Sequence, residues 1–165
     1  YGGGAEQQIK YITNNLSKEF NIKILVLRNK NITEVNSNIE IIKIDKLSIK
    51  NIYSFNSIFK IRRLILQEKV ISASLYFDII CGILKIFTKF DWWIRESNSA
   101  KSKIYIKNKI RSYLGIRANG IISNSKSGYN YWTKYNNNCK LIFNGYPDSL
   151  LNLNTSKNSC LNFKI

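Results

Sequence analysis

The chain of 165 residues contains no histidine. This absence excludes Ser-His-Asp triads, Cys-His nucleophile pairs, His-ligated zinc sites and proton shuttles that depend on imidazole. Cysteine is scarce as well, since Cys81, Cys139 and Cys160 are widely spaced and form no CxxC pair. The pattern indicates neither a disulfide framework nor a thiolate metal site. A reducing cytoplasm is the compartment that it fits best.

Long apolar runs are missing too. The most apolar stretch covers residues 70–90, but Asp78, Lys85 and Lys89 interrupt it. A helix that spans a membrane needs about 20 nearly uncharged residues, so no spanning segment is predicted. Residues 1–6 are small and polar where a signal peptide would carry its apolar region, and no signal peptide is expected.

Acidic residues are few: ten Asp and Glu oppose 26 Lys and Arg, which gives a formal charge of +16. Such a charge brings nucleic acid and anionic membrane surfaces into consideration as partners. The basic residues are mostly lysines spread singly along the chain, in a composition equally rich in Ile and Asn. This bias is typical of AT-rich coding, and solvated lysines explain the charge better than a stripe that follows phosphates. Nucleic acid is therefore not expected as a partner. An anionic membrane surface stays a candidate, because each Lys or Arg near such a surface contributes ~1 kcal/mol to binding.

Helical and strand patterns alternate along the chain. Ala5, Ile9, Ile12 and Leu16 follow the spacing of one helical face, which predicts an amphipathic helix after the first glycines. Further helices are predicted over residues 55–65, 79–87, 106–114 and 127–135, and strands over residues 22–27, 39–44, 70–75, 92–95, 120–123 and 140–143. The alternation indicates right-handed crossovers that feed a parallel sheet, which is a Rossmann-like, doubly wound α/β fold.

Ligands of such sheets bind beyond the carboxyl ends of the strands, so the loops that leave the strands hold the candidate site residues. Four segments fit this position: residues 2–4, 92–99, 123–127 and 144–148. In the first segment, Gly2, Gly3 and Gly4 leave backbone N–H groups free at a helix N-terminus, which suits a phosphate or another anion. A tight turn that lets the helix approach the sheet explains these glycines equally well.

The loop after the tryptophan pair at 92–93 concentrates hydrogen-bonding groups. Arg95 can direct two donors at a hydroxyl, carboxylate or phosphate, and Glu96 and Asn98 can form hydrogen bonds with hydroxyls. In the alternative interpretation, Arg95 and Glu96 pair with neighbours and Ser99 caps the next helix. The tryptophan pair itself is interpreted as core and interface packing rather than as a stacking platform.

The other two segments are partly explained without any function. Ser123, Ser125 and Ser127 place hydroxyls between a strand and a helix, where capping accounts for at least one of them. Asn144 and Gly145 form a common turn sequence. Their position after the last predicted strand is what makes them candidates.

Three of these motifs, in this order, resemble motifs in the N-terminal half of the GT-B glycosyltransferases, in particular the large retaining family called group one or family four. Residues 2–8, GGGAEQQ, look like the GGAE-x-Q helix start of that family. Residues 120–125, GIISNS, look like its A-[VI]-[IV]-x-x-S strand and loop, and residues 144–147, NGYP, look like its N-G-[VY]-[DP] segment. The resemblance covers residues 2–148.

The resemblance implies transfer of a sugar from a nucleotide diphosphate sugar to a saccharide or lipid-linked acceptor, with a retaining mechanism, in bacterial surface polysaccharide or glycolipid synthesis. Residues 1–148 would form the acceptor-side domain, and residues 149–165 a linker and the start of a donor-binding domain. The first strand and most of the donor domain would then be missing, so we expect a fragment that is inactive alone. No cofactor is expected, since the nucleotide diphosphate sugar is a co-substrate. No metal is expected either, because no DxD-like carboxylate pair is present. The expected location is the cytoplasm, peripheral to the inner face of the cell membrane.

The resemblance also implies roles for single residues. The glycines at 2–4 would lie against the donor diphosphate, and Arg95, Glu96 and Asn98 would contact the acceptor or the transferred sugar. Many members of the family carry a histidine in this loop, where the present chain has RESN at 95–98. The leaving phosphate is commonly thought to accept the proton of the acceptor hydroxyl in this family, so Glu96 as a catalytic base is optional.

Ser125, Asn144 and Gly145 would line the cleft between the two domains. Two other interpretations stay open: an inactive truncated fragment, and a basic α/β module that binds nucleic acid. The sequence shows no RNP-like motif, and its aromatic residues and lysines are not interleaved in one strand.

Overall fold

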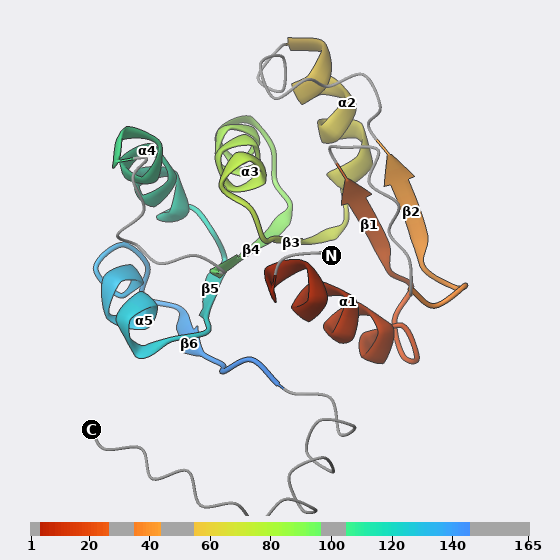
Figure 1. The fold of residues 1–165 in the computed structure, drawn as a ribbon. Helices are drawn as coiled ribbons and strands as arrows, with labels where there is room; N and C mark the ends of the chain where they lie inside the picture. The colour runs from red at the N-terminus through yellow and green to blue at the C-terminus, as the bar shows by residue number, and fades with distance from the viewer. Residues whose placement is uncertain (1–3, 27–34, 44–54, 97–104, 146–165) are drawn as a thin grey trace, which may run out of the picture. The chain divides into compact units, whose positions relative to one another are not determined.

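Helices and strands alternate along residues 4–26, 35–43, 55–96 and 105–145, which the computed structural model describes (Figure 1). The elements in chain order are α1 (Gly4–Leu16), β1 (Lys23–Val26), β2 (Glu40–Lys43), α2 (Phe55–Ile65), β3 (Lys69–Ser72), α3 (Leu75–Phe87), β4 (Asp91–Glu96), α4 (Tyr105–Gly115), β5 (Gly120–Ser123), α5 (Lys126–Trp132) and β6 (Cys139–Leu141). All pairs of described strands are parallel, which confirms an α/β architecture consistent with a Rossmann-like fold. The described strands form two sheets, β1-β2 and β3-β4-β5-β6.

The chain divides into two compact units. The first, called here the α1 unit, comprises residues 1–22, 34–39 and 144–165, and the second, the sheet unit, comprises residues 23–33 and 40–143. Within the sheet unit, α3 and α4 pack side by side on one face of the four-stranded sheet (Figure 1). The expected linker at 149–165 lies outside the described residues.

A helix cap shifts one predicted boundary. The Oγ of Ser74 accepts a hydrogen bond from the backbone N–H of Phe77 at 3.4 Å, so α3 begins at Leu75. The strand predicted over 70–75 therefore ends at Ser72, and the helix predicted from residue 79 begins one turn earlier. The hydroxyl satisfies a backbone donor that the helix itself leaves unpaired.

Two further boundaries at the end of the sheet unit were predicted too far along the chain. Helix α5 ends at Trp132 rather than at residue 135, and β6 covers residues 139–141 rather than 140–143. The partly buried side chains of Tyr131 and Tyr135 still pack against the core, so the apolar pattern that predicted a longer helix reflects packing beyond the helix end.

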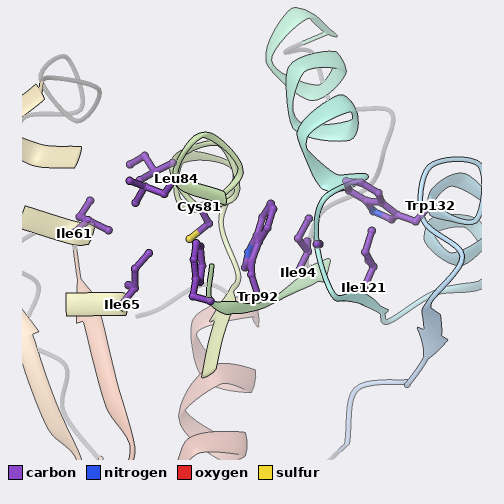
Figure 2. Packing of buried hydrophobic residues seen from close by; sticks show 11 residues of the cluster. Ile61, Ile65, Cys81, Leu84, Trp92, Ile94, Ile121 and Trp132 are labelled. Atoms are coloured by element: carbon purple, nitrogen blue, oxygen red, sulfur yellow. The ribbon is translucent and has the colours of Figure 1, made fainter. Parts of the chain in front are cut away.

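The core of the sheet unit lies between the four-stranded sheet and its helices (Figure 2). Trp92, Ile94 and Ile121 leave the strands toward the core and are fully buried, as is Trp132 of α5. The indole Nε1 of Trp92 donates to the Oγ of Ser72 at 2.9 Å, so this buried donor is satisfied. The interpretation of Trp92 as core packing is confirmed.

Helices α3 and α4 approach each other at Gly82. A Cβ added to Gly82 would lie 2.5 Å from the Cβ of Leu114, an atom held by the α4 backbone. We expect Gly82→Ala to lower the free energy of unfolding by about 2 kcal/mol, because the helices must separate to admit the methyl group. Urea unfolding followed by tryptophan fluorescence measures this loss.

Gly145→Ala is the matched control for Gly82→Ala, since the nearest atom to its added Cβ is a Tyr11 carbon at an ordinary 3.6 Å. A loss of stability equal in the two variants would contradict the close approach of α3 and α4. Among the described helices, none has both the length and the apolar character required to cross a membrane.

Candidate functional site

Two buried polar side chains end neighbouring strands of the four-stranded sheet. Glu96 is the last residue of β4 and Ser123 the last of β5, and the two are partners in the parallel register. Their residues are 1% and 0% exposed. The two side chains therefore meet at the carboxyl edge of the sheet, which is where α/β proteins bind ligands.

Gly128, in the first turn of α5, has no side chain and so leaves space at this edge. A Cβ at this position would lie 2.9 Å from the Oγ of Ser123, 3.2 Å from the Oγ of Ser125 and 3.5 Å from the Oε2 of Glu96. The Oγ of Ser125 also accepts a hydrogen bond from the N–H of Gly128 at 3.1 Å, which makes Ser125 the N-cap of α5. Three side-chain oxygens from β4, β5 and the cap thus surround a point that a larger residue would fill.

Three charged side chains form what we call the carboxylate cluster: Asp78 from α3, Glu96 from β4 and Arg111 from α4. The Nε of Arg111 donates to the Oδ2 of Asp78 at 2.5 Å, and its Nη1 lies 3.7 Å from the Oε1 of Glu96. All three residues are buried. The cluster therefore holds two carboxyl groups and one guanidinium away from solvent.

The two carboxyl groups are not equivalent. Asp78 forms a direct, charge-assisted hydrogen bond with Arg111, whereas the 3.7 Å separation at Glu96 exceeds hydrogen-bond distance. Within the part of the chain that the structure describes, neither oxygen of Glu96 accepts a hydrogen bond, and the Oγ of Ser123 and the Nε1 of Trp132 also lack partners. Buried polar atoms in proteins normally have hydrogen-bond partners. A ligand that binds here could supply the partners that these groups lack.

Burial sets the protonation behaviour of the cluster. It raises the pKa of Glu96 to about 7, and the negative charge of Asp78 adds to the rise while Arg111 opposes it. Burial also raises the pKa of Asp78 against the opposing effect of Arg111 and the Ser72 hydroxyl. Near neutral pH, Glu96 is therefore present both as an acid that can donate and as a carboxylate that can accept.

A small pocket opens beside the cluster. Its lining residues come from β4, α4 and α5 and are Glu96, Asn108, Arg111, Ser112, Tyr131 and Trp132. Its volume of about 10 Å³ admits about one water molecule or one hydroxyl group. The guanidinium of Arg111 stacks 5.1 Å from the Trp132 ring, and the Oγ of Ser112 lies 2.5 Å from the phenol oxygen of Tyr131.

The arrangement suits a neutral hydroxyl better than a metal ion. Arg111 already offsets the negative charge of the two carboxyl groups, so the cluster offers a metal cation little net attraction. In the described segments, no three His, Cys, Asp or Glu side chains are grouped so that they could hold a metal ion. A hydroxyl can donate to Glu96 or accept from it, as the protonation state of the carboxyl requires.

The structure separates Arg95 from Glu96. Adjacent residues of a strand point to opposite faces of a sheet, so Arg95 leaves β4 on the face opposite to Glu96 and the carboxylate cluster. Arg95 is buried, and burial lowers its pKa. The sequence predicted a single group of Arg95, Glu96 and Asn98, of which only Glu96 lines the pocket; Asn98 lies outside the described residues.

The α1 unit brings two other predicted segments together. The side-chain amide of Gln8 in α1 donates to the backbone carbonyl of Gly145 at 2.9 Å. Asn144 and Gly145 are exposed, and Gly4 is the first residue of α1. The glycines at 2–3 lie outside the described residues, so their predicted role at a diphosphate stays a prediction.

Sequence reasoning missed Asp78, Arg111 and Tyr131. Asp78 does carry a sequence signal, because it is the only charged residue in the first two turns of an otherwise apolar helix. Arg111 lies next to Ile110 in a helix with three basic residues, so its burial had no distinguishing sequence signal.

The chain matches no protein family model and no curated protein.

Proposed function

We propose that the chain is the acceptor-side domain of a retaining GT-B glycosyltransferase, which transfers a sugar from a nucleotide diphosphate sugar to a saccharide or lipid-linked acceptor. The parallel α/β architecture and the order of the three motifs support this proposal. One observation carries it: at the carboxyl edge of the sheet, the buried carboxyl group of Glu96 receives no hydrogen bond from any residue that the structure describes. In this proposal the nucleotide sugar is a co-substrate, and the protein works in the cytoplasm next to the membrane.

The size of the pocket supports a specific role for Glu96. Because the pocket admits about one water molecule, it holds a single hydroxyl of a larger acceptor rather than a sugar ring. The carboxylate of Glu96 accepts a hydrogen bond from that hydroxyl, and Arg111 with Asp78 keeps the carboxylate in place. Glu96 thus acts as a positioning residue, which holds the attacking oxygen toward the donor sugar.

Sugar transfer by the full-length gene product tests the proposal, because the proposed donor site belongs to a second domain. UDP-linked and GDP-linked sugars are offered as donors with a lipid extract as the acceptor, and NMR of the product reports the anomeric configuration. We expect Glu96→Gln to lower kcat/KM by about 10- to 100-fold, the effect of losing a hydrogen bond to a charged group. The wild-type rate should rise between pH 6 and pH 8 as Glu96 ionises, and the variant should lack this rise.

Glu68→Gln is the control, since Glu68 is a half-exposed carboxylate that pairs only with Lys23 among the ion pairs of the described residues, at 3.2 Å. It should leave kcat/KM and the pH profile unchanged. Absence of transfer with every donor would overturn the proposal, and equal activities of the two variants would remove Glu96 from it.

A further inference from the structure

The helices of the sheet unit carry an unbalanced surface charge. Helices α2, α3, α4 and α5 contain a single acidic residue, Asp78, and it is buried against Arg111. All other charged residues on these helices are Lys or Arg. The outward charge of the helices is therefore exclusively positive.

Helix α2 combines this charge with exposed aromatic side chains. Ser57, Ile61 and Ile65 form its buried face. Phe55 and Phe59 lie away from that face and are 89% and 54% exposed. Two phenylalanines one turn apart on the outside of a helix are an exposed apolar surface of the kind that marks an interaction site.

Basic side chains flank the phenylalanines of α2. Lys60 and Arg63 are exposed, and the guanidinium of Arg62 lies 5.7 Å from the Phe59 ring. Positive charges next to outward aromatic rings are the pattern of helices that lie in the interface of a membrane.

Helix α4 repeats the pattern. Ile106, Ile110 and Tyr113 are spaced four and three residues apart, so they share one face of the helix, and they are 73%, 46% and 64% exposed. Arg117, just beyond the helix, lies 5.6 Å from the Tyr113 ring. Both α2 and α4 pack against α3 (Figure 1).

We infer that the outer faces of α2 and α4 bind the anionic surface of a lipid bilayer. Phe55, Phe59, Ile106, Ile110 and Tyr113 enter the boundary between headgroups and acyl chains, and the neighbouring Lys and Arg contact the lipid phosphates. The exposed aliphatic side chains of Ile106 and Ile110 favour this partner over nucleic acid, which is bound by basic and polar groups at its phosphates and by aromatic rings that stack on its bases. Tyrosine is also enriched where proteins meet the membrane interface.

Sedimentation of the full chain with vesicles tests the inference. The probes are vesicles of equal parts phosphatidylglycerol and phosphatidylcholine, and vesicles of phosphatidylcholine alone, both at 0.15 M salt. We expect binding to the anionic vesicles and a loss of about 25-fold in Lys60→Gln/Arg63→Gln, since each basic residue near the surface contributes about fivefold. Phe55→Gln/Phe59→Gln should weaken binding by about tenfold through lost apolar insertion.

Two control variants change the same residue types elsewhere. Phe20→Gln/Phe143→Gln replaces phenylalanines that are 60% and 63% exposed, and Lys18→Gln/Lys140→Gln removes two exposed charges. Both controls should bind the anionic vesicles within about threefold of wild type. Because every substituted side chain is exposed, circular dichroism should show the same fold in all variants.

Equal binding to the two kinds of vesicle would overturn the inference. Equal losses in the test and control variants would do so as well, because attraction would then come from net charge and not from these faces. A 20-base oligonucleotide at the same phosphate concentration serves as a competitor. If it displaces the anionic vesicles, and if the phenylalanine variant binds these vesicles like wild type, the basic residues would be assigned to nucleic acid instead.

Discussion

Glu96→Gln is expected to stabilise the sheet unit by about 3 kcal/mol at pH 8 and to leave its stability almost unchanged at pH 4. The side chain is buried with two oxygens that accept no hydrogen bond from the described residues, so its ionised form is poorly solvated. Glutamine has nearly the same shape and carries no charge. The measurement is urea unfolding between pH 4 and pH 8, followed by tryptophan fluorescence.

The direction follows from the raised pKa of Glu96. Its pKa is about 7 in the folded chain, against 4.5 for an unperturbed glutamate side chain. A carboxyl group with a raised folded pKa contributes stability below its unfolded pKa and loses that contribution as the pH rises toward the folded value. Wild type should therefore lose stability between about pH 4.5 and pH 7, and the variant should not.

The exposed Glu68→Gln variant should show the wild-type pH dependence. If Glu96→Gln were instead less stable than wild type at pH 8, the ionised carboxylate would be well satisfied in the folded chain. The Glu96 site would then be filled already and would offer nothing to an acceptor hydroxyl.

Arg111→Met is expected to have the opposite effect, a loss of about 3 to 5 kcal/mol at pH 8. Methionine keeps much of the apolar stem but leaves Asp78 and Glu96 buried without a positive charge. The same unfolding measurement detects this loss. It should shrink toward pH 4, because protonation of the carboxyl groups removes the uncompensated charge.

The triple variant Asp78→Asn/Glu96→Gln/Arg111→Met tests the electrostatic origin of this loss. It contains no charge in the cluster and should recover most of the stability. Arg117→Met, at an exposed arginine, should stay within about 0.5 kcal/mol of wild type. A triple variant no more stable than Arg111→Met would show that packing of the arginine stem, and not its charge, stabilises this region.

The regular elements of the sheet unit could be predicted because their signals are local. Helix α2 and strand β5 have the predicted bounds, 55–65 and 120–123, since apolar spacing within each segment reflects the face that it buries. The boundary between β3 and α3 was wrong by several residues, because one side-chain hydroxyl, that of Ser74, decides it.

The carboxylate cluster could not be predicted in this way. Asp78 and Arg111 are 33 positions apart, on two helices whose contact depends on the missing side chain of Gly82. Glu96 was recognised as a candidate from its place after a predicted strand. Which neighbouring side chains lie on the same face of the sheet as Glu96 depends on the alternation of side chains along the strand. The alternation along β4 is what sends Arg95 and Glu96 to different faces.

The hydrogen bond between Gln8 and Gly145 has a consequence for the order of folding. The two residues are 137 positions apart, so α1 is synthesised long before the last described segment and cannot make this contact until that segment follows. Closing so long a loop in an unfolded chain carries an entropic penalty, which becomes smaller once the intervening residues have folded. The sheet unit contains all its own strand pairs and can fold before that point. We therefore expect α1 to join residues 144–145 as a late step of folding, and its amide hydrogens to exchange with solvent faster than those of β4 and β5.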